Sequence, residues 1–105
     1  MPELHPQAAA LLERIAASSY PPYHAVPPFV ARRINHDTRA ALAPPPPEVA
    51  EARLLIAAGR VAMRAYRPQG AAKDERLPAL VFFHGGGWTI GDLDTHDVLC
   101  RELAN

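Results

Sequence analysis

The stretch FFHGGGWTIGDLDTHD, residues 82–97, contains three consecutive glycines in a chain that has only six. It directly follows the apolar run ALVFF, residues 79–83, and precedes a segment with helical periodicity. Glycine loses more conformational freedom on folding than any other residue, so three together indicate a backbone geometry or a close approach that side chains would forbid. These glycines are therefore the first candidate for a functional site.

The composition is that of a soluble globular protein, with 105 residues of which 49% are apolar and 21% charged. Eleven basic and eleven acidic residues cancel, so the charge does not indicate a nucleic acid or an anionic membrane as partner. The single cysteine, Cys100, excludes an internal disulfide and fits a reducing compartment, and we expect the cytoplasm. The N-terminus has no basic leader and no long apolar run, so we expect neither a signal peptide nor a membrane span.

The first half of the sequence predicts two helices. Apolar residues recur at helical spacing over residues 6–18, whereas the many prolines of residues 20–28 predict an irregular connection. A second helix is expected over residues 29–42, with four inward positions: Phe29, Val30, Ile34 and Ala41. The prolines of residues 44–47 predict a stiff extended linker, and a proline-recognition motif is the alternative. We expect residues 1–47 to form one portion and residues 48–105 another.

The second half predicts strands and one further helix. An antiparallel hairpin is expected around Ala58 and Gly59, where two strand-like halves meet. Residues 79–83 are nearly all apolar, which is typical of a parallel strand covered on both faces. A helix is expected over residues 94–104, capped by Asp94 and with Asp97 in its first turn.

A glycine-rich bend between a strand and a helix can turn free N–H groups toward a ligand and so receive an anion. The phosphate-binding motifs do not match, because no lysine followed by serine or threonine comes after the glycines and the spacing is not G-x-G-x-x-G. A turn without a chemical role remains the alternative.

The motif HGGGW, residues 84–88, followed by GDLDTHD, residues 91–97, resembles the oxyanion segment of α/β-hydrolases. More specifically, it resembles the bacterial hormone-sensitive lipase family of carboxylesterases, as do RAYRP at residues 64–68 and LPALVFF at residues 77–83. The resemblance implies an α/β fold class, namely the N-terminal portion of an α/β-hydrolase fold. That portion would comprise cap helices, a β-hairpin, the first parallel strand, the oxyanion loop and the following helix, with an incomplete sheet.

The resemblance also implies roles for five residues. The backbone N–H groups of Gly86 and Gly87 would stabilise the oxyanion of an acyl-transfer intermediate, and Gly85 would let the loop bend. His84 would hold the loop and would not act as the general base. Trp88 would line the substrate pocket, although an ordinary core position is an equal alternative. The expected substrate is an ester with a short to medium acyl chain, and no cofactor is implied.

Four polar residues after the glycines could suggest a metal site: Asp92, Asp94, His96 and Asp97. An EF-hand loop starting at Asp92 would need glycine where Asp97 stands and glutamate where Leu103 stands. We therefore expect no metal, and we assign these residues to loop hydrogen bonding and helix capping.

The catalytic serine that such an esterase needs, on a G-x-S-x-G turn, does not occur in the sequence, whose only serines are Ser18 and Ser19. The acid and the histidine that should follow it are missing as well. We expect the chain to be the N-terminal part of a longer serine carboxylesterase or lipase, inactive alone, whose partner is the missing C-terminal part. The alternative is a non-catalytic binding or assembly module that docks a partner through its cap helices and open strand edges.

Overall fold

A regular antiparallel hairpin forms the only sheet in the computed structural model, which describes residues 3–105. Strand β1, Glu51–Ala57, pairs with strand β2, Val61–Arg67, from Glu51 opposite Arg67 to Ala57 opposite Val61. Ala58 and Gly59 both have positive φ, 49° and 71°, as a type I′ turn requires of its central residues. The hairpin predicted around Ala58 and Gly59 is confirmed.

Three α-helices and one 3₁₀ turn make up the rest of the regular structure. Helix α1 spans Pro6–Ala16, and α2 spans Pro28–Leu42, with each helix starting at a proline that needs no N–H partner there. The connection between them contains the 3₁₀ turn η1, Tyr23–Ala25, and helix α3 spans Asp97–Ala104. Both predicted N-terminal helices are confirmed, although α1 ends two residues before position 18.

The inner face of α2 differs in part from the predicted one. Ala31, Ile34 and Asn35 are buried, so the face follows the i, i+3, i+4 pattern through these positions. The inward prediction is correct for Ile34 but wrong for Phe29, which is 71% exposed, and for Ala41, which is also exposed. Both lie away from the face that packs on the rest of the chain.

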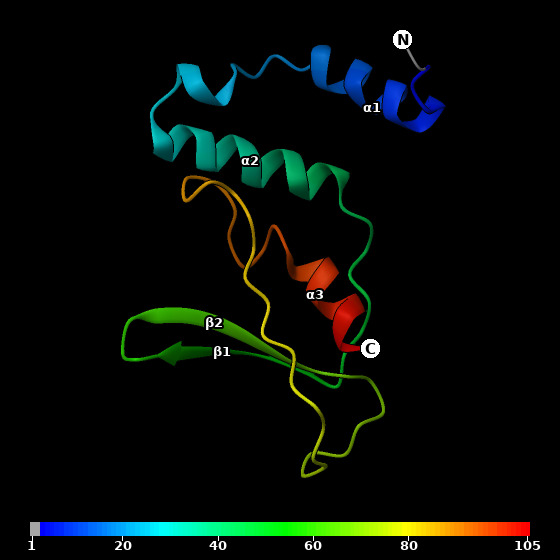
Figure 1. The fold of residues 1–105 in the computed structure, drawn as a ribbon, viewed down its shortest axis with the longest axis vertical. Coiled ribbons are helices and arrows are strands. Elements are labelled where there is room, and N and C mark those ends of the chain that lie inside the picture. The colour runs from blue at the N-terminus through cyan, green and yellow to red at the C-terminus, as the bar shows by residue number, and fades with distance from the viewer. Residues whose placement is uncertain (1–2) are drawn as a thin grey trace.

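The apolar run at residues 79–83 does not form the predicted strand. Leu80, Val81 and Phe83 are exposed, Phe83 to 87%, and the run crosses the molecule as an unpaired segment (Figure 1). Within residues 3–105 the sheet consists of β1 and β2 alone, so no neighbouring strand accepts the hydrogen bonds of this run. The prediction of a strand covered on both faces is therefore wrong for this structure.

Helix α3 begins three residues later than expected. His96, not Asp94, is its N-cap residue, and no side chain caps the helix, so the capping role predicted for Asp94 is wrong. The carboxylate of Asp94 instead pairs with Arg64 on β2. Asp97 lies in the first helical turn, as predicted.

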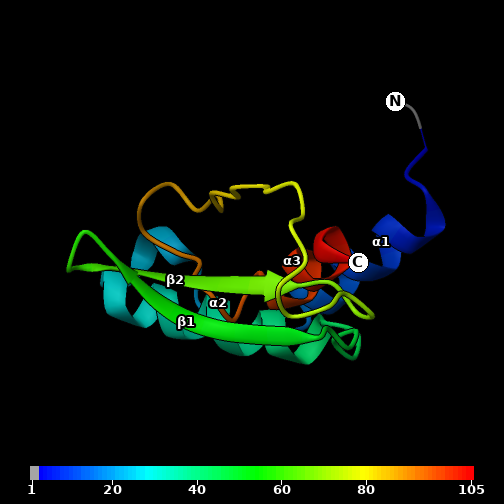
Figure 2. The ribbon, with the colours of Figure 1, turned by 90° about the horizontal axis from the view of Figure 1, so that it is seen from below.

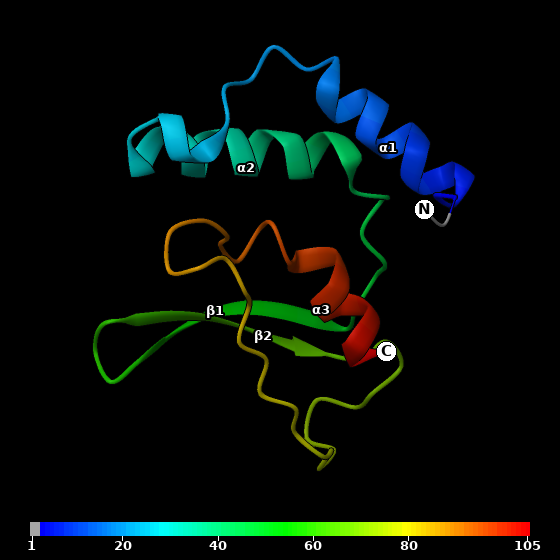
Figure 3. The ribbon, with the colours of Figure 1, turned by 45° about the horizontal axis from the view of Figure 1, so that its top comes forward.

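The elements form loosely connected layers rather than a packed core. We call residues 84–91 the glycine loop. Helix α2 lies above, the hairpin lies below, and the glycine loop and α3 lie between them (Figures 1 and 3). Seen from below, the hairpin lies across α2 (Figure 2). The radius of gyration is 17.0 Å, against about 13 Å expected for a compact domain of this length. Few side chains are buried, so polar contacts between the layers hold the arrangement. None of the helices described is both long and apolar enough to cross a membrane.

Candidate functional site

The glycine motif forms a tight turn whose backbone angles suit glycine. The N–H groups of Thr89 and Ile90 both donate to the carbonyl of Gly86, over 3.1 and 3.0 Å. Gly86 and Gly87 have φ of 147° and 58°, and a Cβ at Gly86 would overlap the carbonyl group of Ile90. Only glycine therefore fits at Gly86. Gly85 does not share the positive φ of Gly86 and Gly87, and its role in letting the loop bend stays a prediction.

The N–H groups of Gly86 and Gly87 have no hydrogen-bond acceptor within the described part of the chain. Both residues border an open hollow of about 460 Å³, which is otherwise lined by Arg32 and by the neighbouring residues of the loop. Two adjacent unpaired N–H groups beside a hollow are the arrangement that receives a developing negative charge.

His84 holds the peptide group that carries the Gly86 N–H. Its Nδ1 lies 2.9 Å from the carbonyl oxygen of Gly85, and with the proton on Nδ1 the ring donates to that oxygen. The ring stacks on His96, with the centroids 5.0 Å apart. Because the peptide bond is trans and planar, fixing the Gly85 carbonyl also fixes the direction of the Gly86 N–H on its opposite side.

Gly91 makes room for this contact, and sequence reasoning assigned it no role. A Cβ at Gly91 would lie 2.9 Å from both the Gly85 oxygen and Nδ1 of His84, and its φ of 91° is unfavourable for other residues. The glycine four residues after Gly87 was the available signal. A side chain there would push His84 off the loop.

Arg32 of α2 holds the other end of the turn, and sequence reasoning missed it too. Its Nε donates to the carbonyl oxygen of Thr89 over 2.7 Å. The two residues lie 57 positions apart, so no local pattern could have connected them.

Trp88 follows the glycines with its side chain fully exposed beside the hollow. The alternative that placed it in the core is therefore wrong. Its contact with a substrate stays a prediction. Its φ of 57° is unusual for a residue with a side chain and belongs to the same left-handed turn as Gly87.

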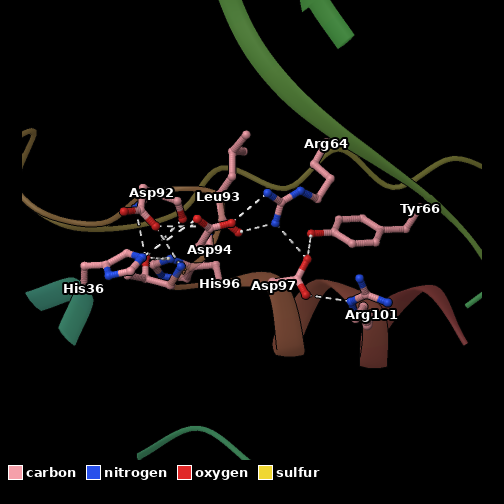
Figure 4. Close-up of polar contacts among 10 residues, drawn as sticks. His36, Arg64, Tyr66, Asp92, Leu93, Asp94, His96, Asp97 and Arg101 are labelled. Carbon is pink, nitrogen blue, oxygen red and sulfur yellow. Dashed lines mark hydrogen bonds and ion pairs between the residues drawn. The ribbon is translucent and has the colours of Figure 1, made fainter. Parts of the chain in front are cut away.

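An ion-pair network joins the loop to the hairpin (Figure 4). Arg64 of β2 contacts Asp94 over 2.7 Å and Asp97 over 2.9 Å, and it also donates to the Leu93 carbonyl over 3.2 Å. The hydrogen bond to Asp94 is the main reason that the pKa of Arg64 lies above its usual range. The segment between the glycine loop and α3 is thereby fixed on the hairpin.

Asp97 is the central acceptor of this network. Besides Arg64 it accepts hydrogen bonds from Tyr66 over 2.6 Å and from Arg101 over 2.6 Å. Burial raises the pKa of Asp97, but the hydrogen bonds from Tyr66, Arg101 and Arg64 together outweigh it and hold the pKa below its usual range. Burial, followed by the bond to Asp97, raises the pKa of Tyr66 to about 12.

Asp92 caps the turn that leads into α3. Its Oδ1 accepts hydrogen bonds from the N–H groups of Asp94 and Thr95 over 2.9 and 2.7 Å, and its own N–H donates to Oγ1 of Thr95 over 2.8 Å. Nδ1 of His96 lies 3.0 Å from the same hydroxyl. The expected hydrogen-bonding role of these polar residues is confirmed, since each of them has a partner within the chain.

Comparison with known proteins identifies the family. A sequence profile described as the alpha/beta hydrolase fold matches residues 80–105, the glycine motif and α3 included. The structure superposes on an ester hydrolase, EH1AB1 from the metagenome of Lake Arreo, with a TM-score of 0.85 and 36% identity over 98% of this chain. The chain belongs to the α/β-hydrolase family. The fold class predicted from the sequence, with an incomplete sheet, is confirmed.

Several sequence relatives of this α/β-hydrolase chain are named as ester hydrolases. Carboxylic ester hydrolase LipN of Mycobacterium tuberculosis is 61% identical over 44 residues, which are 42% of this chain and 11% of LipN. Ethyl acetate hydrolase of Pseudomonas putida is 33% identical over 109 residues, which cover 96% of this chain and 34% of that protein. The α/β-hydrolase chain thus spans about a third of the length of ethyl acetate hydrolase, although nearly all of this chain is aligned. The resemblance to hormone-sensitive-lipase-like carboxylesterases is confirmed.

Proposed function

We propose that this chain supplies the oxyanion hole of a serine carboxylic ester hydrolase. The N–H groups of Gly86 and Gly87 are the two donors. The supporting observation is that both groups lack an acceptor within residues 3–105, while the peptide groups that carry them are held from the carbonyl side. Donors fixed before the reaction stabilise the tetrahedral oxyanion without reorganising, which is worth about a hundredfold to a thousandfold in rate for each donor.

The hollow beside the loop can receive a neutral ester, because the two N–H groups need a negative charge only in the intermediate and not on the substrate. The tetrahedral intermediate carries its negative charge on the former carbonyl oxygen, next to the two N–H groups. The name of the Pseudomonas putida relative, ethyl acetate hydrolase, favours short acyl chains. We extend this to short and medium acyl esters.

The chain alone does not hydrolyse esters under this proposal. Ser18 and Ser19 follow the C-terminal end of α1, and the Ser18 hydroxyl donates to the carbonyl of Ile15 over 2.7 Å. Neither serine is on a strand-to-helix turn with glycines around it, which is the setting of a hydrolase nucleophile. The serine, acid and general-base histidine therefore come from residues beyond this sequence.

We further propose that residues 1–47 act as a cap portion and residues 48–105 as the start of the hydrolase core. The proline run at residues 44–47, which is neither helix nor strand, supports this division, and α2 reaches the glycine loop across it through the bond of Arg32 to Thr89. The cap would then influence the oxyanion loop directly.

The test uses a chimera in which this chain replaces the matching third of ethyl acetate hydrolase. We expect the isolated chain to be inactive on p-nitrophenyl acetate, butyrate and octanoate, and the chimera to hydrolyse the shorter esters. Gly86→Ala in the chimera should lower kcat about a hundredfold, because the added Cβ displaces the turn.

The matched control is Gly70→Ala, since Gly70 also has a positive φ, 82°, with open space around it. An active isolated chain, or a chimera in which both glycine variants behave alike, would contradict the proposal.

The unpaired run at residues 79–83 favours a second candidate, a non-catalytic assembly module. Its exposed apolar side chains and free backbone could add to a strand of a partner. Sedimentation velocity distinguishes the two: a defined complex that forms without any gain of esterase activity supports the module.

A further inference from the structure

We propose that Arg32 is a positioning residue that fixes and polarises the Gly87 N–H through two intervening peptide groups. The inference rests on the proposed function for its catalytic meaning, although the geometry stands without it. We call the path from the guanidinium of Arg32 through the Thr89–Ile90 peptide to the Gly86–Gly87 peptide the peptide relay.

The peptide relay consists of two consecutive hydrogen bonds. Nε of Arg32 donates to the carbonyl oxygen of Thr89 over 2.7 Å. The N–H of Ile90, on the opposite side of that same peptide group, donates to the carbonyl oxygen of Gly86 over 3.0 Å. The Gly86 carbonyl belongs to the peptide group whose N–H is that of Gly87. In each peptide group, the hydrogen bond at the carbonyl oxygen thus fixes the direction in which the N–H points.

Planarity makes this path rigid. No described peptide bond is cis, so in each group the N–H points opposite to the carbonyl. Holding the Gly86 carbonyl therefore aims the Gly87 N–H away from the turn. At Gly87 itself φ is 58° and there is open space where a Cβ would stand, so packing of a side chain does not hold this residue in place.

The charge on Arg32 has the correct sign to strengthen the final donor. A cation at the Thr89 carbonyl draws electron density toward itself and makes the Ile90 N–H a better donor. That bond in turn polarises the Gly86–Gly87 peptide, so the Gly87 N–H becomes more positive. A negative charge developing on an ester oxygen is stabilised more by such a polarised N–H.

Arg33, the next residue of α2, shows what a neighbouring arginine does without this contact. Its Nε pairs with Asp37 over 3.1 Å along the helix, and its side chain is highly exposed. It therefore has the same charge on the same helix but takes no part in the relay. This makes Arg33 a matched control.

The test follows the backbone amides of the full chain directly. Labelling with ¹⁵N-glycine gives amide signals from only six residues, two of which, Gly59 and Gly70, lie outside the loop and report whether the fold is intact. We expect Arg32→Leu to move the Gly87 amide proton upfield while leaving Gly59 and Gly70 in place. Arg32→Lys, which keeps a charged donor, should restore part of the shift, and Arg33→Leu should leave Gly87 unchanged.

A Gly87 signal that stays in place in Arg32→Leu, or that moves equally in Arg33→Leu, overturns the proposal. If Arg32→Leu also displaces Gly59 and Gly70, the comparison of Arg32→Lys with Arg32→Gln decides. A shift that follows the charge supports the relay, and equal signals in the two variants overturn it.

A second measurement addresses catalysis in the chimera with ethyl acetate hydrolase. Because the relay strengthens one donor rather than removing it, Arg32→Leu should lower kcat about tenfold, with KM changed less than about twofold. An inactive parent chimera would contradict the proposed function while leaving the amide result to judge the relay. A parent that is active, with a variant of equal kcat, would contradict the catalytic meaning of the relay.

Discussion

The hydroxyl of Tyr66 donates a hydrogen bond of 2.6 Å to Oδ1 of Asp97, joining strand β2 to the first turn of α3 (Figure 4). The same oxygen accepts from Arg64, and the other oxygen accepts from Arg101. A single carboxylate thus connects the hairpin to the helix that follows the glycine loop. In a structure with few buried apolar side chains, this connection takes on much of the role that a hydrophobic core would have.

Removing the charge of Asp97 should destabilise the fold more than removing that of Asp94. We expect Asp97→Asn to lower the free energy of unfolding by about 1.5 to 3 kcal/mol, because charged hydrogen bonds to three side chains are weakened. The side chain of Asp94 is 64% exposed, against 17% for Asp97. Asp94→Asn should therefore lower the free energy of unfolding by no more than about 1 kcal/mol. Urea unfolding of both variants measures the difference, and equal costs would contradict the central place of Asp97.

Acid should weaken the fold through Asp97. Its pKa in the folded chain lies below the ordinary value of 3.8, so the unfolded chain binds more protons in acid. The contribution of this carboxylate is complete above about pH 4 and is lost as the pH falls further through the folded pKa. Urea midpoints measured from neutral pH into acid should fall, and Asp97→Asn should flatten this dependence. A variant with the same acid slope as the parent would rule out Asp97 as its source.

Alkali should act through Tyr66. Its pKa is raised to about 12 from an ordinary value of 10.0, so the neutral phenol is favoured in the folded chain. This contribution is present below pH 10 and is lost as the pH rises toward 12. A difference titration of phenolate absorbance, parent minus Tyr66→Phe, should show a single ionisation near pH 12. An ionisation near pH 10 would show that the phenol is neither buried nor bonded to Asp97.

Gly91→Ala should disturb the glycine loop by displacing His84. The new Cβ would lie 2.9 Å from Nδ1 of His84 and from the Gly85 carbonyl, so we expect a loss of about 1 to 3 kcal/mol in the free energy of unfolding. Gly70→Ala isolates the cost of positive φ, because Gly70 has a similar angle with no atom nearby. Thermal melts compare the two, and a cost at Gly91 no larger than at Gly70 would contradict the steric argument.

The unpaired apolar run should drive self-association. Phe83 is 87% exposed, and we expect Phe83→Lys to reduce light scattering of the concentrated chain with a stability change within about 0.5 kcal/mol. Phe29→Lys is the control, since Phe29 is 71% exposed on a helix without a free strand edge. If both substitutions reduce scattering equally, general surface hydrophobicity explains the association.

Local signals in the sequence predicted the two N-terminal helices and the hairpin. Gly59 marked the hairpin turn, because glycine readily accepts the positive φ of that position, whereas Ala58 adopts a positive φ that alanine disfavours. The proline at residue 28 marked the start of α2, which begins at that proline, one residue before the predicted position 29. The glycine motif indicated the tight turn, in which Gly86 and Gly87 have positive φ.

Contacts between distant segments could not be predicted in this way. Which face of α2 turns inward depends on the loop that it meets, so Phe29 and Ala41 were placed wrongly. Asp94 has the chemistry of a helix cap but pairs with Arg64, 30 positions away. The run at residues 79–83 has the composition of a buried strand, but that state needs neighbouring strands.

The bond between Arg32 and Thr89 also has a consequence for the order of folding. Its two ends are separated by 57 positions, so we expect it to close late, after the local hairpin and helices have formed. Until α2 reaches the loop, a newly synthesised chain can hold correct secondary structure while the Gly87 amide remains free to reorient. Reaction competence would then be acquired last. In the refolding chimera with ethyl acetate hydrolase, a slow step in the docking of α2 would appear as a lag between the recovery of helical circular dichroism and the recovery of turnover.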